Sequence, residues 1–247
     1  AVRLHQGLRY YAADKDNRFL SYDLLAADQR TVTRSGQDRN EQTWGLTTDT
    51  ALEIGWADGR ATHTSLVGID ASRLRLTSKR YSRTATDLDL FDPIYGGPVG
   101  PRVPAYAWGD TVEQIGLYAQ DQMKIGDRWV VVFGGRQDWV RQTSTDPFTG
   151  AVTADGERSD AFTARAGLVY LAPNGLAPYA SFSQSFEPVT GFDRQGTRFV
   201  PTRGTQYELG LRYVPPGRDI LLAAAVYDLT QTNGLVSDPA DTTFSVQ

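Results

Sequence analysis

The chain contains no cysteine, which excludes disulfide bonds, thiolate metal sites and a cysteine nucleophile. Histidine is scarce as well, and the two present, His5 and His63, stand far apart, so we expect neither to bind a metal. Long apolar runs are also missing. The longest, Ile220 to Tyr227, is far shorter than the roughly 20 residues of a membrane-spanning helix. The net charge of -4 argues against a nucleic-acid partner.

Signals of catalysis are missing too. The sequence has no G-x-S-x-G nucleophile elbow, and the placement of its two histidines predicts no Ser-His-Asp arrangement. Pairs of acidic residues are plentiful, but any acidic loop offers them, so they are not specific for glycosidase chemistry. We therefore expect a protein that is not an enzyme.

What the chain does contain is a period of two, most clearly between Thr111 and Val140. Two stretches of alternating polarity flank a turn of about three residues at 126–128, which predicts a β-hairpin. On the first strand, one face carries Ile115, Leu117, Ala119, Met123 and Ile125, and on the second the corresponding residues are Trp129, Val131, Phe133 and Trp139. Each strand has about ten residues, and a tilted strand needs roughly 9–11 to cross a bilayer.

Two kinds of connection alternate along the chain. Short ones, rich in Gly, Pro, Asn and Asp, are predicted at 57–60, 126–128, 172–175 and 215–218. Long ones are predicted at about 82–110, 141–159, 187–204 and 232–243. This alternation is typical of a membrane barrel with tight turns at one rim and long loops at the other. The fold class predicted is all-β, an antiparallel transmembrane β-barrel segment.

About nine to ten strands are expected. Their approximate ranges are 2–22, 28–56, 61–80, 111–125, 129–142, 160–171, 177–187, 204–214 and 219–231, with a tenth beginning near 243. The aromatic residues expected near the strand ends as interfacial girdles are Trp56, Trp129, Trp139, Tyr170 and Tyr213. The charged residues expected to face inward as a polar lattice are Arg136, Asp138, Arg165, Glu187, Glu208 and Arg212. Asp121 falls on the apolar face near the short-turn rim and fits the barrel poorly. A soluble β-sandwich that binds carbohydrate through Trp and Tyr remains the alternative.

Eight runs of sequence, in order, resemble those of TonB-dependent outer-membrane siderophore receptors, in the branch that takes up ferrichrome and related hydroxamates. The runs are LHQGLRYY (4–11), HTSLVGID (63–70), LDLFDPIYGG (88–97), IGLYAQDQMK (115–124), GGRQDW (134–139), LAPNGLAPYASFSQSFEPVTG (171–191), FVPTRGTQYELGLRYVPPG (199–217) and AAAVYDLTQTN (223–233).

The resemblance implies a barrel of about 22 strands whose lumen holds an N-terminal plug. It implies short periplasmic turns, long extracellular loops and a place in the bacterial outer membrane. A ferric siderophore would be the ligand, with no cofactor. The partners implied are the TonB–ExbB–ExbD complex, which acts through the plug, and outer-membrane lipid and lipopolysaccharide.

The expected domain organisation is that residues 1–247 form part of the receptor barrel, without the plug and without the first and last barrel strands. An open sheet would leave unpaired edges in hydrocarbon, where each unsatisfied backbone group costs several kcal/mol. The alternative is that this piece closes on itself as a smaller barrel.

The resemblance places four aromatic residues in the long loop 82–110, above the barrel mouth, as expected ligand contacts: Phe91, Tyr95, Tyr106 and Trp108. A pocket of this kind, mostly aromatic with a few polar groups, suits a ferric hydroxamate. Other cargo stays open at this point, namely a cobalamin, a nickel complex or an oligosaccharide.

Overall fold

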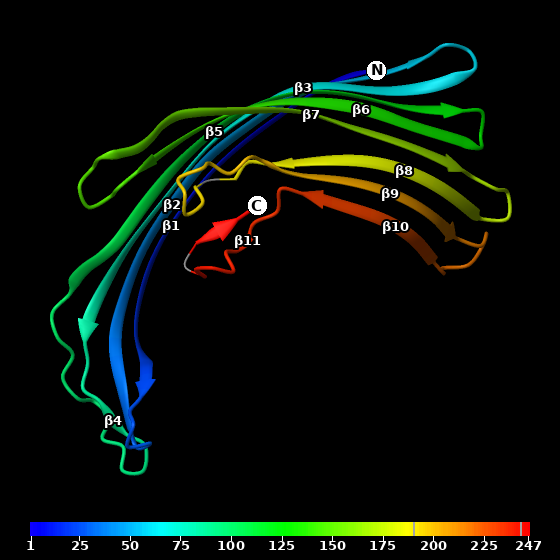
Figure 1. Ribbon diagram of the computed structural model, residues 1–247. Helices are drawn as coiled ribbons and strands as arrows, with labels where there is room; N and C mark the ends of the chain where they lie inside the picture. The colour runs from blue at the N-terminus through cyan, green and yellow to red at the C-terminus, as the bar shows by residue number, and fades with distance from the viewer. Residues whose placement is uncertain (190, 243) are drawn as a thin grey trace.

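A computed structural model describes residues 1–189, 191–242 and 244–247. Most of the chain forms one long, curved antiparallel sheet (Figure 1). Its long strands are β1 (Val2–Leu25), β2 (Thr31–Ala57), β3 (Ala61–Thr84), β5 (Val103–Ile125), β6 (Trp129–Thr145), β7 (Val152–Tyr170), β8 (Leu176–Glu187), β9 (Thr202–Tyr213) and β10 (Leu222–Thr232). The two-residue strand β4 (Leu88–Asp89) pairs with β2, and β11 (Val236–Ser237) pairs with β12 (Ser245–Val246). No helix in the described ranges is long and apolar enough to span a membrane.

The long strands pair in chain order, so the sheet is a meander from β1 to β10. This confirms the expected all-β, antiparallel class. Two alternatives are wrong. A sandwich needs two packed sheets, and only one large sheet is present in the described residues. A small closed barrel needs a ladder between the first and last long strands, but within the described chain β1 pairs only with β2 and β10 only with β9.

The register sorts side chains onto two faces, because side chains alternate along a strand. Tyr118 of β5 lies opposite Arg136 of β6 on what we call the polar face. Ile115 lies opposite Trp139 on the other, which we call the apolar face. The hairpin around residues 126–128 therefore has the two faces that its sequence predicted.

The four short connections are tight turns, as expected. Each contains a glycine with positive φ, a conformation that residues with a Cβ rarely adopt. These glycines are Gly59, Gly126, Gly175 and Gly217, with φ between 54° and 88°.

The opposite rim differs from expectation, because the strands there run further than the sequence indicated. The connection expected at 82–110 spans only 85–102, since β3 continues to Thr84 and β5 begins at Val103. The connection expected at 141–159 is a tight hairpin turn between Thr145 and Val152. The alternation of apolar and polar residues stops where the lipid would end. The backbone pairing of the strands continues beyond that point, through polar residues.

At the C-terminal end a strand begins near 243, as expected, but it is the two-residue β12 and it pairs with β11. The residues after β10 form a small ladder of β11 and β12 and add no tenth long strand to the sheet. Thr243, where that strand and the end of the 232–243 connection were expected, lies outside the described residues, as does Thr190 in the 187–204 connection. The rest of that connection is long, as expected, running from the end of β8 to Thr202.

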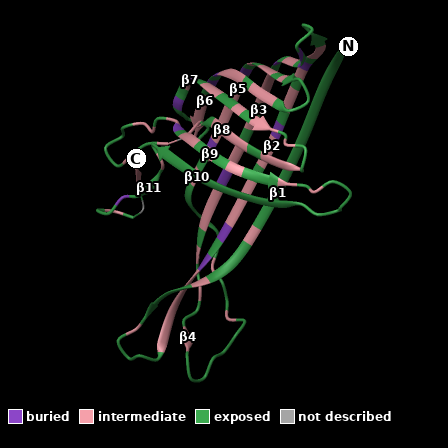
Figure 2. Cartoon of the chain, turned by 90° about the vertical axis from the view of Figure 1, so that its right-hand side faces the viewer, coloured by how far each residue is buried: buried purple, intermediate pink, exposed green. Residues whose placement is uncertain are grey.

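Little of the sheet is buried (Figure 2). Buried apolar side chains in the described chain are few and mostly small, such as Ala51, Val140 and Ala161. On the apolar face, Phe133, Phe162 and Leu209 are 52%, 60% and 61% exposed. A continuous apolar surface of this kind needs a cover, and the hydrocarbon of a bilayer provides one.

Glycines on the polar face make room for large side chains from the next strand. The Tyr118 ring lies against Gly68 of β3, at the place a Cβ would occupy, and its hydroxyl donates to Asp49 Oδ1 of β2 at 2.7 Å. Gly167 of β7 lies on the same face, and the nearest atom to a Cβ there would be the Ala180 carbonyl oxygen at 3.9 Å.

We expect Gly68→Ala to displace Tyr118 and to destabilise the full-length receptor by about 1–3 kcal/mol, a usual cost of overpacking. The matched control Gly167→Ala should be close to neutral, because its methyl group has space. Unfolding by heat, followed as the change in electrophoretic mobility, measures both. Equal midpoints for the two variants would contradict this packing.

Candidate functional site

Tyr106 and Trp108 lie on β5 and point to the polar face, as Tyr118 does further along the same strand. The sequence interpretation had put both in a loop, and this is wrong because β5 begins at Val103. Tyr106 lies opposite Arg80 of β3, and Trp108 lies opposite Ser78. Their exposed fractions are 52% and 36%, so both rings offer surface to a ligand at the long-loop end of the sheet.

Two arginines accompany these rings. Arg80 of β3 stacks its guanidinium over Tyr106, with 5.2 Å between Cζ and the ring centroid, a cation–π contact. Arg39 of β2 lies directly opposite Arg80. Its Nε is 3.9 Å from Glu41 Oε1. The polar face therefore combines aromatic surface with positive charge at this level.

A hollow of about 330 Å³ adjoins Trp108. Ser144 of β6 donates to Asp110 Oδ1 in its wall at 2.6 Å, and Phe192, from the connection between β8 and β9, closes another side. Segments far apart in the chain thus meet beside Trp108.

Phe91 and Tyr95 lie in the connection between β4 and β5, as expected, and are 76% and 74% exposed. Figure 1 shows this segment at the far end of β2 and β3. Asp89 anchors it by accepting from the Phe91 backbone N–H at 2.9 Å and from Arg30 Nε at 2.5 Å. These contacts, the Phe91 N–H first, hold the pKa of the Asp89 carboxyl below its ordinary value. In the described residues, no ring pair joins Phe91 or Tyr95 to Tyr106 or Trp108.

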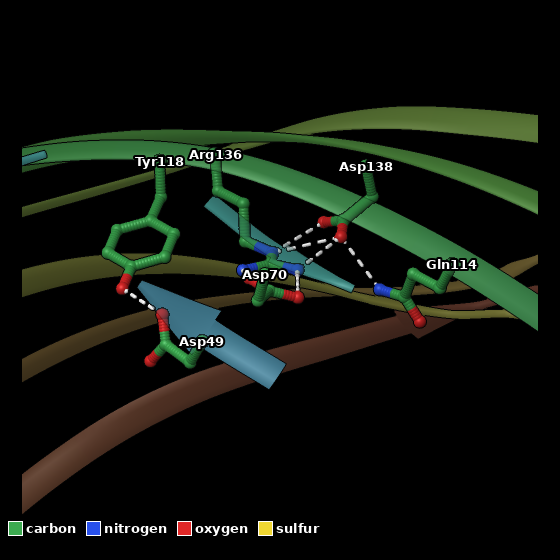
Figure 3. Close-up of polar contacts among 6 residues, drawn as sticks. All are labelled: Asp49, Asp70, Gln114, Tyr118, Arg136 and Asp138. Atoms are coloured by element: carbon green, nitrogen blue, oxygen red, sulfur yellow. Dashed lines mark hydrogen bonds and ion pairs between the residues drawn. The ribbon is translucent and has the colours of Figure 1, made fainter. Parts of the chain in front are cut away.

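Arg136 of β6 is the centre of a polar lattice on the same face (Figure 3). Its Nε donates to both carboxylate oxygens of Asp138, at 2.9 and 2.8 Å. Its other nitrogens bind Asp70 of β3, with Nη2 donating to Oδ1 at 3.0 Å. Gln114 also donates to Asp138, at 2.7 Å. Asp138 is only 3% exposed, so these donors replace the water that it lacks.

This lattice confirms the polar face expected from the sequence. Glu208 of β9 accepts from the Tyr179 hydroxyl at 2.6 Å and from Gln206 at 2.9 Å. Beside the lattice is a hollow of about 410 Å³, with Arg165 of β7 in its wall. The polar face is therefore held together by hydrogen bonds and ion pairs between side chains, and it contains a hollow.

Asp121 has partners that the sequence did not reveal. On the apolar face it accepts from Ser65 Oγ at 2.7 Å, and its other oxygen is 2.7 Å from His63 Nδ1. Trp56 stacks on His63 with 3.8 Å between ring centroids, and its Nε1 donates to Ser65 Oγ at 2.9 Å. A serine, a histidine and an aspartate thus meet, contrary to expectation. They do not form a catalytic triad, because Ser65 donates to the carboxylate and not to the imidazole.

The structure thus brings together two of the four expected contact residues, Tyr106 and Trp108, and leaves Phe91 and Tyr95 in a separate segment. Sequence reasoning missed Arg39 and Arg80. The signal that identifies them is the pairing register of β2, β3 and β5, which a single sequence does not contain.

Comparison with known proteins identifies close relatives of this sheet. The family described as TonB dependent receptor-like, beta-barrel, matches residues 2–247. The ferrichrome outer membrane transporter/phage receptor of Escherichia coli is 37% identical over 223 residues, which cover 84% of this chain and 28% of that protein. The ferrioxamine B receptor of Salmonella typhimurium is 32% identical over 206 residues, covering 83% of this chain and 29% of the relative.

Among solved structures, the closed form of the ferric-catecholate import receptor Fiu from Escherichia coli has the same fold. Its TM-score is 0.79 at 16% identity, and the match covers 100% of this chain and 40% of that one. The chain spans less than a third of the length of the two curated relatives.

We expect Arg136→Met to destabilise the full-length receptor by about 3 kcal/mol, because it leaves the buried Asp138 carboxylate without a counter-charge. Replacing all three members, as Arg136→Met with Asp70→Asn and Asp138→Asn, should recover at least half of the loss. Arg212→Met, on the same face but exposed and outside the hollow, is the matched control and should cost little. Urea unfolding of the purified receptor measures the series. A triple variant no more stable than Arg136→Met would contradict the role of the lattice.

Proposed function

Because this chain belongs to the family of TonB-dependent receptor β-barrels, we propose that it forms the central wall of a receptor that takes up a ferric siderophore of hydroxamate type. The barrel lies in the outer membrane of a Gram-negative bacterium. Proteins of this family are transport receptors and not enzymes. The polar face then lines the lumen, and the apolar face meets lipid.

The observation that carries the proposal is the pair Tyr106 and Trp108 on the lumen face, near the rim with the longer connections. Aromatic rings with a few polar groups suit an iron chelate, whose outer surface is largely organic. Phe91 and Tyr95 are proposed as further contacts, supplied by the loop on which they are exposed. The relatives named for ferrichrome and ferrioxamine B support a siderophore as cargo over cobalamin, a nickel complex or an oligosaccharide.

Transport itself is proposed to need parts beyond this sheet. Residues 1–247 are proposed as part of the barrel domain, completed by further strands that pair with β1 and β10. A plug domain is proposed to fill the lumen against the Arg136 lattice and its hollow, and to receive energy from the TonB–ExbB–ExbD complex. The lattice would keep the wall rigid while the plug moves.

The membrane partner is proposed to be lipopolysaccharide, together with ordinary outer-membrane lipid. A groove of about 670 Å³ on the apolar face has Leu46, Ile115 and Trp139 in its wall. Arg73, Arg141 and Arg158 also border it, together with the acidic Glu113 and Asp160. Apolar side chains next to guanidinium groups suit acyl chains beneath phosphates.

To test the ligand site, we expect Tyr106→Ala and Trp108→Ala in the full-length receptor each to weaken binding of a ferric hydroxamate siderophore about tenfold or more, a change of roughly 1.4 kcal/mol. The control Trp139→Ala removes an indole from the lipid-facing side and should leave affinity unchanged. Binding of radioactive iron chelates to intact cells provides the measurement.

Growth on a panel of iron chelates, with cobalamin as a further substrate, tests the cargo. Rescue by ferric hydroxamates that is lost in the Trp108→Ala strain is the expected result. Failure of every ferric siderophore to support growth would refute the assignment.

A further inference from the structure

Two rows of side chains cross the lumen face at the level of the proposed ligand site. One row runs Arg39, Arg80, Tyr106 across β2, β3 and β5, and the next runs Glu41, Ser78, Trp108. Each row joins neighbouring strands directly, so these side chains are close neighbours on one surface.

Charge in these rows is unbalanced. Arg39 and Arg80 face each other as like charges, an unfavourable cross-strand pair unless something lies between or beside them. Glu41 is the nearby carboxylate, but Lys15 Nζ is 3.5 Å from it, closer than Arg39 at 3.9 Å. In the described residues, Arg80 has no ion pair and is engaged only by the ring of Tyr106. Lys15 and Arg39 therefore share one carboxylate, and Arg80 has none.

Several polar atoms in these two rows also lack a hydrogen-bond partner in the described structure. The Nε atoms of Arg39 and Arg80 and the Oγ atom of Ser78 are buried without a hydrogen-bond partner in the described structure. Ser78 is fully buried. Buried polar groups in proteins are almost always satisfied, so a cluster of unsatisfied ones indicates a partner that the chain itself does not supply.

We propose that Arg39 and Arg80 bind a carboxylate of the ferric siderophore, and that the receptor therefore prefers negatively charged hydroxamate chelates to neutral and cationic ones. This inference rests on the proposed function. A guanidinium matches the planar fork of a carboxylate, and two of them compensate its charge fully. The stack on Tyr106 holds Arg80 in place, while Tyr106 and Trp108 offer ring surface to the apolar parts of the same ligand.

Other occupants fit less well. A neutral hydroxamate oxygen accepts a hydrogen bond but leaves the excess positive charge uncompensated. Lipopolysaccharide phosphates would approach the lipid-facing side, whereas both arginines lie on the opposite face of the sheet. A carboxylate from the proposed plug is the remaining competitor, and it would hold the arginines whatever the charge of the chelate.

The test uses three chelates that differ only in one terminal group: a linear ferric trihydroxamate with a free ammonium, its acetylated neutral form, and its succinylated form bearing a carboxylate. Affinities are measured with the purified full-length receptor. We expect the succinylated chelate to bind at least tenfold more tightly than the acetylated one, and the ammonium form to bind most weakly.

Arg39→Gln and Arg80→Gln should each weaken binding of the succinylated chelate about tenfold while changing the acetylated one less than twofold. Arg80→Lys, which keeps the charge but loses the fork, should keep part of the preference. The control Arg165→Gln removes a cation from the same face, away from the two rows, and should leave the preference intact. Heat modifiability confirms that each variant is folded.

Equal affinity of the wild-type receptor for all three chelates would overturn the inference while leaving the proposed function standing, and would favour a plug carboxylate as the partner of the arginines. An equal loss for all three chelates in the arginine variants would also overturn it, since that result indicates a supporting role. If no ferric hydroxamate binds at all, the proposed function fails as well.

Discussion

The structure depends above all on the hydrogen-bond ladder between neighbouring strands. A bilayer offers no partner for a backbone N–H or C=O group, so a strand within it must be paired along its whole membrane-spanning length. Once the ladder is formed, the alternation of side chains along each strand determines which residues face lipid and which face the lumen. A shift of one residue would exchange the faces and place Arg136 in lipid and Trp139 in the lumen.

On the lumen face, glycines lie beside large polar residues. The polar side chains can therefore reach hydrogen-bond partners on neighbouring strands. Gly68 and Gly116 leave space into which Tyr118 and Arg136 lay their side chains. That close approach brings the guanidinium to carboxylates on two strands, and it allows Asp138 to be buried while charged. Nearer the long-loop rim the pattern changes, since Arg80 lies over the ring of Tyr106 and directly opposite Arg39, with Glu41 as the nearby carboxylate. The charges around Arg136 are thus paired within the wall, whereas Arg80, near the long-loop rim, has no carboxylate partner in the described residues.

The sequence predicted the strand class, the tight turns and the lipid-facing side, because each of these is a local property read from alternation or from glycine. It placed Tyr106 and Trp108 in a loop, because Val103 to Gly109 includes a proline and is small or apolar on both faces, so no alternation marks it as a strand although the backbone is paired. The partners of Asp121 and the pairing of Arg39 with Arg80 were not predictable either. Both depend on register between strands, and register is a relation between distant segments. In each case the contacts of the residue come from a neighbouring strand, so its role is visible only once the strands are paired.

The central claim is that one face of this sheet meets water and the other meets lipid. Residues 1–247 contain no cysteine. Once any cysteine elsewhere in the full-length receptor is replaced, single spin labels can be attached along β5 in a bilayer, through Gln114→Cys, Ile115→Cys, Leu117→Cys, Ala119→Cys and Gln120→Cys. The most direct measurement is the accessibility of each label to oxygen and to a water-soluble nickel complex. The account predicts alternation, with oxygen favoured at 115, 117 and 119 and the nickel complex favoured at 114 and 120. A uniform response along the strand, or the opposite alternation, would contradict it.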